Sequence, residues 1–257
     1  DELANLKSLT DVEVYNCPKM TQFPMALAKL PEMISLNISN NSQWSAEEVY
    51  KGLDAIANGP AKEKLQILYV RDNNLREVPE SFRNLKKIGL LDLAQNQIET
   101  IHPLGKEVAP VKLYFDNNKL TSLPADGNGL FCTMDDVETF SATYNKFTKF
   151  PNIFSAKSKF TIKSVDFSYN EIDGFEGEED GTFRGLNIEQ LSLAANKFTK
   201  FPKCLGTTGS LVAYIILRGN MIDEIPEGSF SGKYSTSMTS LDLTYNKLKT
   251  LSKDFTA

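Results

Sequence analysis

The dominant pattern along the chain is a short hydrophobic motif that returns every 22 to 32 residues. The segments 65–79 (LQILYVRDNNLREVP), 188–202 (IEQLSLAANKFTKFP) and 238–251 (MTSLDLTYNKLKTL) show it clearly. In each segment, apolar residues occupy the first, fourth, sixth, eleventh and fourteenth positions, and the ninth position is Asn. A motif that recurs at such a period is typical of a repeat architecture, in which each unit is one turn of the chain.

Aligning the units on the Asn residue gives nine Asn in one column and Cys17 at the same position in the first unit. The column consists of Asn41, Asn73, Asn96, Asn118, Asn145, Asn170, Asn196, Asn220 and Asn246. An Asn side chain both donates and accepts hydrogen bonds. It can therefore satisfy backbone groups that are buried where the chain turns away from a strand. We expect these residues to form a structural Asn ladder, with Cys17 as a buried thiol.

The apolar columns around the Asn predict a short strand in every unit. Successive side chains of a strand point to opposite faces, so the central apolar residues point inward and the residues between them outward. One unit cannot bury its apolar side alone, whereas stacked units form a continuous core. The sequence therefore predicts about ten stacked parallel strands.

The pattern LxxLxLxxNxLxxL resembles that of the leucine-rich-repeat superfamily, over essentially the whole chain. The resemblance implies an α/β fold, a right-handed solenoid shaped like a horseshoe, with a parallel β-sheet on the concave face. Recurring X-Pro pairs after the Asn column predict a mostly irregular or 3-10 convex side. We expect a single domain of about ten repeats over residues 1–257. We also expect it to be a fragment of a longer bacterial protein of the secreted or surface type.

Three insertions interrupt the regular spacing. After Trp44, Ser45 and Glu48 form a capping box, followed by apolar residues at helical spacing. We therefore expect one inserted α-helix over about residues 46–57, on the convex side. Residues 125–136 are predicted to form a turn-rich loop. Residues 173–185 are acidic and rich in Gly, but their spacing does not match a calcium-binding EF-hand loop, and we expect a solvated loop.

Composition and charge narrow the possible chemistry. The 28 Lys and Arg against 33 Asp and Glu give a net charge of −5, which argues against binding to nucleic acid. The apolar runs are too short for a membrane span. The single His102 follows a strand in an exposed turn, and the three Cys are predicted to be free. We therefore expect no catalytic residues, no metal site and no cofactor.

The residues that point outward from the strands form the candidate binding surface. Tyr and Arg are common in binding hot spots, and they gather with charges on three neighbouring predicted strands. A smaller group lies near the end of the chain, and three tyrosines (Tyr144, Tyr169 and Tyr245) stand beside the Asn column. The predicted partner-binding residues are Tyr69, Arg71, Asp72, Asp92, Tyr114, Asp116, Tyr214 and Arg218.

These observations favour a non-catalytic recognition module that binds a protein or peptide on its concave face. A broad sheet offers contact area rather than an enclosed pocket, which favours a macromolecular partner. Two alternatives remain open: a substrate-recognition arm of a bacterial effector enzyme whose catalytic domain lies outside this chain, and a cell-surface binder of glycans or other ligands. We expect a monomer that is secreted or on the cell surface, with a cytoplasmic location as the alternative.

Overall fold

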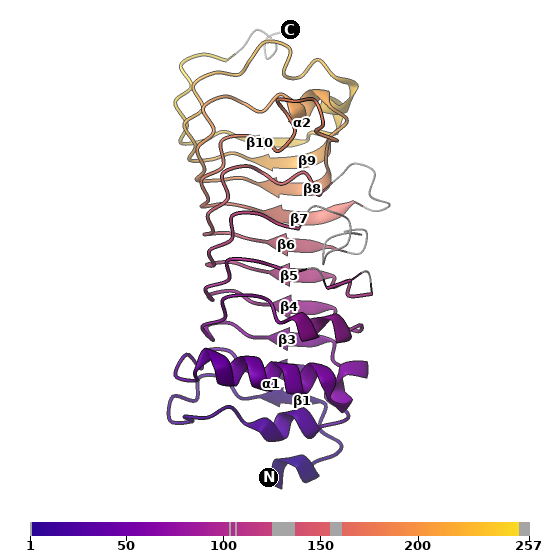
Figure 1. The fold of residues 1–257 in the computed structure, drawn as a ribbon. Helices are drawn as coiled ribbons and strands as arrows, with labels where there is room; N and C mark the ends of the chain where they lie inside the picture. Colours follow the sequence, from indigo (N-terminus) through magenta and orange to yellow (C-terminus); the bar gives the residue numbers. More distant parts are fainter. Residues whose placement is uncertain (1, 103, 106, 125–136, 155–160, 252–257) are drawn as a thin grey trace. The chain divides into compact units, whose positions relative to one another are not determined.

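The structure of the protein, a computed structural model, describes residues 2–102, 104–105, 107–124, 137–154 and 161–251. It divides into two compact units, residues 1–133 and 134–257. Within each unit the strands run side by side, one for each turn of the chain (Figure 1). The single-domain organisation over residues 1–257 stays a prediction.

The first unit contains five parallel strands in sequence order: β1 (Asp11–Glu13), β2 (Ser35–Asn37), β3 (Ile67–Tyr69), β4 (Leu90–Asp92) and β5 (Lys112–Tyr114). In each strand the middle residue is buried. These are the apolar residues that the repeat pattern places inward, namely Val12, Leu36, Leu68, Leu91 and Leu113. The register therefore stacks equivalent apolar positions into one core.

The second unit has the same construction, with β6 (Thr139–Ser141), β7 (Ile162–Asp166), β8 (Asn187–Ser192), β9 (Leu211–Ile216) and β10 (Ser240–Asp242). Its core is rich in phenylalanine. The ring of Phe167 lies 5.0 to 6.0 Å from four other rings, those of Phe140, Phe147, Phe150 and Phe154. Aromatic rings at such distances add to the stabilisation that burial provides.

The segments that return from one strand to the next are mostly 3-10 or irregular, which confirms the prediction for this side. The 3-10 helices are η1 (Glu2–Asn5), η2 (Met25–Lys29), η3 (Pro60–Glu63), η4 (Glu80–Asn84) and η6 (Lys233–Ser237), and a short helix α2 covers Cys204–Thr207. The turn-rich loop predicted at 125–136 lies outside the described residues. The predicted repeat solenoid is confirmed in both units.

The inserted helix α1 spans Ala46–Asn58, so the prediction of 46–57 is confirmed to within one residue. The Ser45 side chain accepts a hydrogen bond from the backbone N–H of Glu48, which caps the helix. The face that includes Val49, Leu53 and Ile56 is buried, and α1 packs against η2, η3 and η4. Amphipathic patterning and a cap were therefore sufficient to locate this helix.

The burial of Cys17 was predicted wrongly. Its side chain is only partly buried, and Sγ contacts the backbone oxygen of Tyr15 at 3.5 Å. The strand of this unit, β1, pairs only with β2 among the described strands. The Cys17 position is therefore covered from one side only.

Candidate functional site

Three rows of side chains cross the outer face of the first unit's sheet, which is the face predicted to be concave. The strand register aligns Tyr69 on β3 with Asp92 on β4, and Asp92 with Tyr114 on β5. Arg71 and Asp116 follow two residues later on the same face. We call Tyr69, Arg71, Asp92, Tyr114 and Asp116 the central cluster. The structure thus brings together five of the residues predicted to bind a partner.

Asp92 differs from its predicted role as an exposed charge. Its side chain is only 6% exposed, and its carboxylate lies 3.1 Å from the guanidinium of Arg71. The other carboxylate oxygen accepts the backbone N–H of Ala94 at 3.0 Å. Burial raises the pKa of Asp92 above its ordinary value, although the bonds from Ala94 and Arg71 oppose the shift. Asp92 therefore serves as a buried support that orients Arg71.

The hydrogen bond that Asp92 accepts from the N–H of Ala94 recurs at the equivalent strand end of other units. Asn37, Asp166 and Asp242 each accept the N–H two residues further along, at 2.8 to 3.0 Å. This short side-chain bond fixes the chain where it leaves the strand. The sequence signal is an Asn or Asp four residues before the column Asn, a signal that the sequence prediction of outward positions did not use.

The two tyrosines of the central cluster are half-buried on either side of Asp92. Burial is the main cause that raises the pKa of Tyr114, and the negative charge of Asp92 adds to it. The side chain of Arg71 is 41% exposed. The cluster therefore offers two aromatic side chains and one cation held in place by a buried carboxylate.

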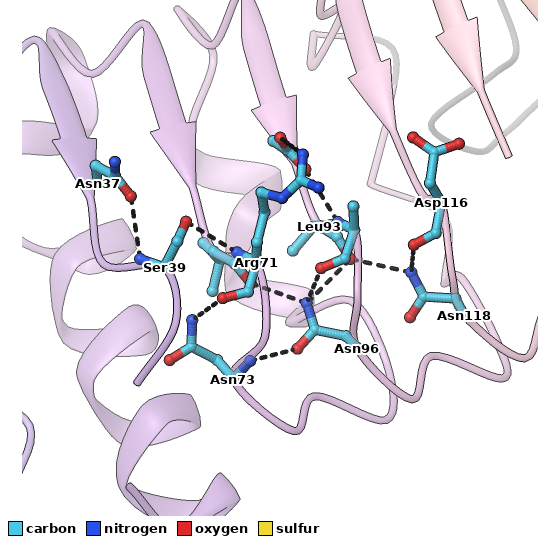
Figure 2. Close-up of polar contacts among 11 residues, drawn as sticks. Asn37, Ser39, Arg71, Asn73, Leu93, Asn96, Asp116 and Asn118 are labelled. Carbon is cyan, nitrogen blue, oxygen red and sulfur yellow. Dashed lines mark hydrogen bonds and ion pairs between the residues drawn. The ribbon is translucent and has the colours of Figure 1, made fainter. Parts of the chain in front are cut away.

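The Asn column lies at the edge of the sheet, where each strand gives way to a turn. The Asn96 side chain donates to the backbone oxygens of Val70, Leu93 and Ala94, and it accepts the N–H groups of Asn73 and Leu75. Figure 2 shows Asn96 between the turns that carry Asn73 and Asn118. Asn41, Asn118, Asn170, Asn196, Asn220 and Asn246 make equivalent donor bonds to the preceding turn. Each of these amides therefore joins two consecutive repeats.

The residue before the column position adopts a left-handed backbone in every unit, a feature that sequence reasoning missed. Its φ lies between +49° and +57° at the non-glycine positions and is +71° at Gly219. The non-glycine members are Asn16, Asn40, Asp72, Gln95, Asn117, Tyr144, Tyr169, Ala195 and Tyr245. Asn and Asp tolerate this conformation better than other non-glycine residues. Asp72 therefore has a structural reason for its place, besides its predicted role in binding.

The predicted group near the end of the chain belongs to the second unit. Tyr214 on β9 is 44% exposed. Arg218 follows β9, and its guanidinium carbon lies 4.6 Å from the centre of the Tyr245 ring. Tyr144 and Tyr169 are each 50% exposed and stack in parallel, with ring centres 4.2 Å apart. Sequence reasoning placed these tyrosines beside the Asn column but did not predict the stack.

The other candidate groups have structural partners. Nε2 of His102 lies 3.0 Å from the carboxylate of Glu77 at the surface. Cys204 is buried, and this burial raises the pKa of its thiol. In the acidic loop, Asp173 pairs with Lys149 at 3.0 Å, and Asp180 accepts the N–H of Thr182. Within the described part of the chain, no three His, Cys, Asp or Glu side chains are grouped so that they could hold a metal ion.

Comparison with known proteins agrees with the repeat fold. A family model described as Leucine Rich Repeat matches residues 64–85. The solved structure of a leucine-rich repeat protein from Bacteroides eggerthii is 40% identical with a TM-score of 0.84, over 98% of this chain and 43% of that one. A similar protein from Bacteroides thetaiotaomicron is 39% identical with a TM-score of 0.81, over 98% of this chain and 31% of that one.

Among curated proteins, human lumican is 29% identical over 171 residues, which are 62% of this chain and 47% of lumican. The chain thus spans about half the length of this relative. In both units the fold is that of a solenoid in which one strand follows another in register. The chain has the leucine-rich-repeat fold. Its bacterial origin stays a prediction.

None of the helices in the described part of the chain is both long enough and apolar enough to cross a membrane.

Proposed function

We propose that the chain is a non-catalytic recognition module that binds a protein or peptide on the outer face of its sheet, through the central cluster. Leucine-rich-repeat proteins in general mediate protein–protein interactions. The observation that carries the proposal is the in-register placement of Tyr69, Asp92 and Tyr114, with Arg71 held over the buried carboxylate.

The arrangement lowers the entropic cost of binding. Rigid aromatic side chains and an immobilised Arg lose little conformational freedom when a partner arrives. The Arg71 guanidinium is held by Asp92, which is itself fixed by the N–H of Ala94. Tyr69 and Tyr114 lie two strand steps apart, roughly 10 Å. The cluster thus presents preformed anchor points.

Charge favours a partner with basic side chains. The central cluster together with Asp72 carries one positive and three negative groups, so its formal charge is 1 − 3 = −2. A Lys or Arg of the partner would be attracted by Asp72 and Asp116, and cation–π contact with Tyr69 or Tyr114 would add to this attraction. We therefore propose a basic protein or peptide segment as the partner of this surface.

Photo-crosslinking tests the proposal. A benzoylphenylalanine placed at position 69 or 114 is expected to capture one and the same protein from the source organism. The matched control carries the crosslinker at position 51, an exposed site on α1, and the captured protein should be absent there. Capture should weaken as salt is raised, because exposed charges are screened. Equal capture from position 51 would contradict the proposal, as would capture that is indifferent to salt.

The finer expectations about the cell remain predictions. We propose a secreted or surface location and a monomeric state. Fractionation of the source organism and sedimentation of the purified chain would test them. Recovery of the full-length protein only from the cytoplasm would contradict the first, and a concentration-independent dimer would contradict the second.

A further inference from the structure

The second unit has a line of exposed tyrosines along the turn that follows its strands. We call Tyr144, Tyr169 and Tyr245 the tyrosine ridge; Tyr169 and Tyr245 are separated by two units in which the equivalent residues are Ala195 and Gly219. Tyr144 and Tyr169 are each 50% exposed and Tyr245 is 76% exposed. The ridge is therefore accessible, and two small residues form a gap within it.

The backbone gives no reason for tyrosine at these positions. The φ values are +53° for Tyr144, +57° for Tyr169 and +55° for Tyr245, a region that bulky residues rarely adopt. Equivalent positions of the first unit include Asn16, Asn40 and Asn117, which suit this conformation. Strained residues that persist point to a function. These strained backbone positions therefore carry exposed aromatic rings.

The rings are stacked along the direction in which the repeats are stacked. The rings of Tyr144 and Tyr169 are parallel within 6° and 4.2 Å apart, close to the strand step of about 4.8 Å. One face of the Tyr169 ring is covered by Tyr144, so its other face is directed toward Ala195. The ridge thus presents a free aromatic face to the gap.

The guanidinium of Arg218 bounds the other side of the gap. Arg218 precedes Gly219, and its guanidinium lies over the ring of Tyr245 from the β9 side, 4.6 Å from the ring centre. Tyr169 and Tyr245 are three strand steps apart, about 14 Å. Subtracting 4.6 Å leaves roughly 10 Å between Tyr169 and the guanidinium. A flat group needs about 3.5–4 Å on each face, or about 7–8 Å in all, so one flat group fits in this gap.

The charges around the ridge favour an acidic segment. Lys146, Lys197, Lys247 and Arg218 are exposed and positive, whereas Asp166, Glu171 and Asp242 are negative, which gives 4 − 3 = +1. Glu171 pairs with Lys197, so these two charges compensate each other and leave the net value unchanged. This sign is opposite to that of the central cluster.

We propose that the gap between Tyr169 and Arg218 is a second binding site, which takes an aromatic side chain carried by an acidic peptide segment of a partner protein. An aromatic ring is attracted to both walls, because it stacks on tyrosine and a guanidinium binds its face. A sugar ring could stack on Tyr169 through its C–H groups, but it would gain less from the cation. The site is separate from the central cluster and adds to the function proposed above.

The test uses the purified chain and a phage-displayed library of random dodecapeptides. Three variants accompany the wild type. Tyr144→Asn with Tyr169→Asn removes the stack and installs the residue type that the first unit has at the same φ, so thermal melting should be unchanged or raised. Ala195→Tyr fills the gap with a residue that sister units hold in the same conformation. Tyr69→Ala is the matched control on the central cluster.

We expect the library to enrich peptides in which Trp, Tyr or Phe is flanked by Asp or Glu. A synthetic peptide of this kind should bind at least about tenfold more weakly to the double Asn variant and to Ala195→Tyr, and equally well to Tyr69→Ala. The Ala195→Tyr variant is decisive, because it adds an aromatic surface. Stronger binding by this variant would show adhesion to exposed tyrosine and overturn the proposed gap.

Two other results would also overturn the proposal. One is the absence of any enriched peptide whose binding depends on Tyr169. The other is binding of a neutral probe, cellohexaose, that Ala195→Tyr abolishes while acidic aromatic peptides do not bind. A partner that depends on Tyr69 and Tyr114 but ignores the ridge variants would uphold the function proposed above and refute this second site alone.

Discussion

Replacing Asn96 with Ala tests how the Asn column stabilises the stacked repeats. The substitution removes the acceptor of the backbone N–H groups of Asn73 and Leu75. It also removes the donor to the oxygen of Val70. Asn96 is 8% exposed, so water has little access to these groups. Among the described residues, neither N–H has another hydrogen-bond partner.

The magnitude follows from the two orphaned donors. Each buried N–H without a partner costs about 1–3 kcal/mol, so the free energy of unfolding should fall by about 2–6 kcal/mol. Asn96→Asp should also destabilise at neutral pH, because a carboxylate accepts hydrogen bonds but cannot donate to the three carbonyl oxygens. Protonation should restore part of that loss at acid pH. The control Gln97→Ala alters a half-buried amide nearby and should cost less than about 0.5 kcal/mol.

Urea unfolding followed by circular dichroism measures the loss, and hydrogen exchange measures it locally. The amide protons of Asn73 and Leu75 should exchange much faster in Asn96→Ala than in the wild type, because they lose their acceptor. A fall of less than about 1 kcal/mol together with unchanged exchange at both amides would refute this account of the Asn column.

Three further substitutions test the packing and the electrostatics. Gly52→Ala should destabilise the protein by about 1–3 kcal/mol in thermal melting, because the new Cβ would lie 2.2 Å from the buried ring of Phe23. Ala normally favours a helix, so a gain in stability would contradict this packing argument. Tyr50→Phe should cost about 0.5–1.5 kcal/mol in urea unfolding, since two exposed backbone N–H groups exchange the hydroxyl that they donate to for water; no change would contradict it. Burial raises the folded-state pKa of Asp92 above 3.8, so its ionisation lowers stability as pH rises from that value through the folded pKa. Asp92→Asn should therefore be at least as stable as the wild type at pH 7, and it should not show the fall in stability that Asp92 ionisation causes as pH rises. A variant that is less stable than the wild type at pH 7 would show that the ion pair with Arg71 outweighs the cost of burial.

The repeat pattern contained most of the fold because it is local and periodic. The strand positions, the inserted helix and the Asn column all follow from residue types at fixed spacing. Asp92 could not be assigned correctly in this way. Its burial depends on Tyr69 and Tyr114, which come from neighbouring strands and lie 23 and 22 residues away.

Backbone conformation is a second reason why only part of the candidate site could be predicted from the sequence. The left-handed residue before each column position alternates between types that suit it, such as Asn16, and types that do not, such as Tyr169. A hydrophobicity pattern does not report φ, so the tyrosines could be placed beside the Asn column but not recognised as strained and stacked. The contact of the Arg218 guanidinium with the Tyr245 ring likewise could not be predicted from the sequence, because it depends on the conformation of the Arg218 side chain.

The central claim is that the central cluster binds a protein or peptide partner. The most direct test is calorimetric titration of the partner identified by crosslinking into the double variant Tyr69→Ala/Tyr114→Ala. Tyr144→Asn with Tyr169→Asn is the control, because it also replaces two exposed tyrosines but lies in the other unit. We predict at least about tenfold weaker binding to the first variant, corresponding to 1.4 kcal/mol or more. Wild-type affinity in that variant would contradict the account.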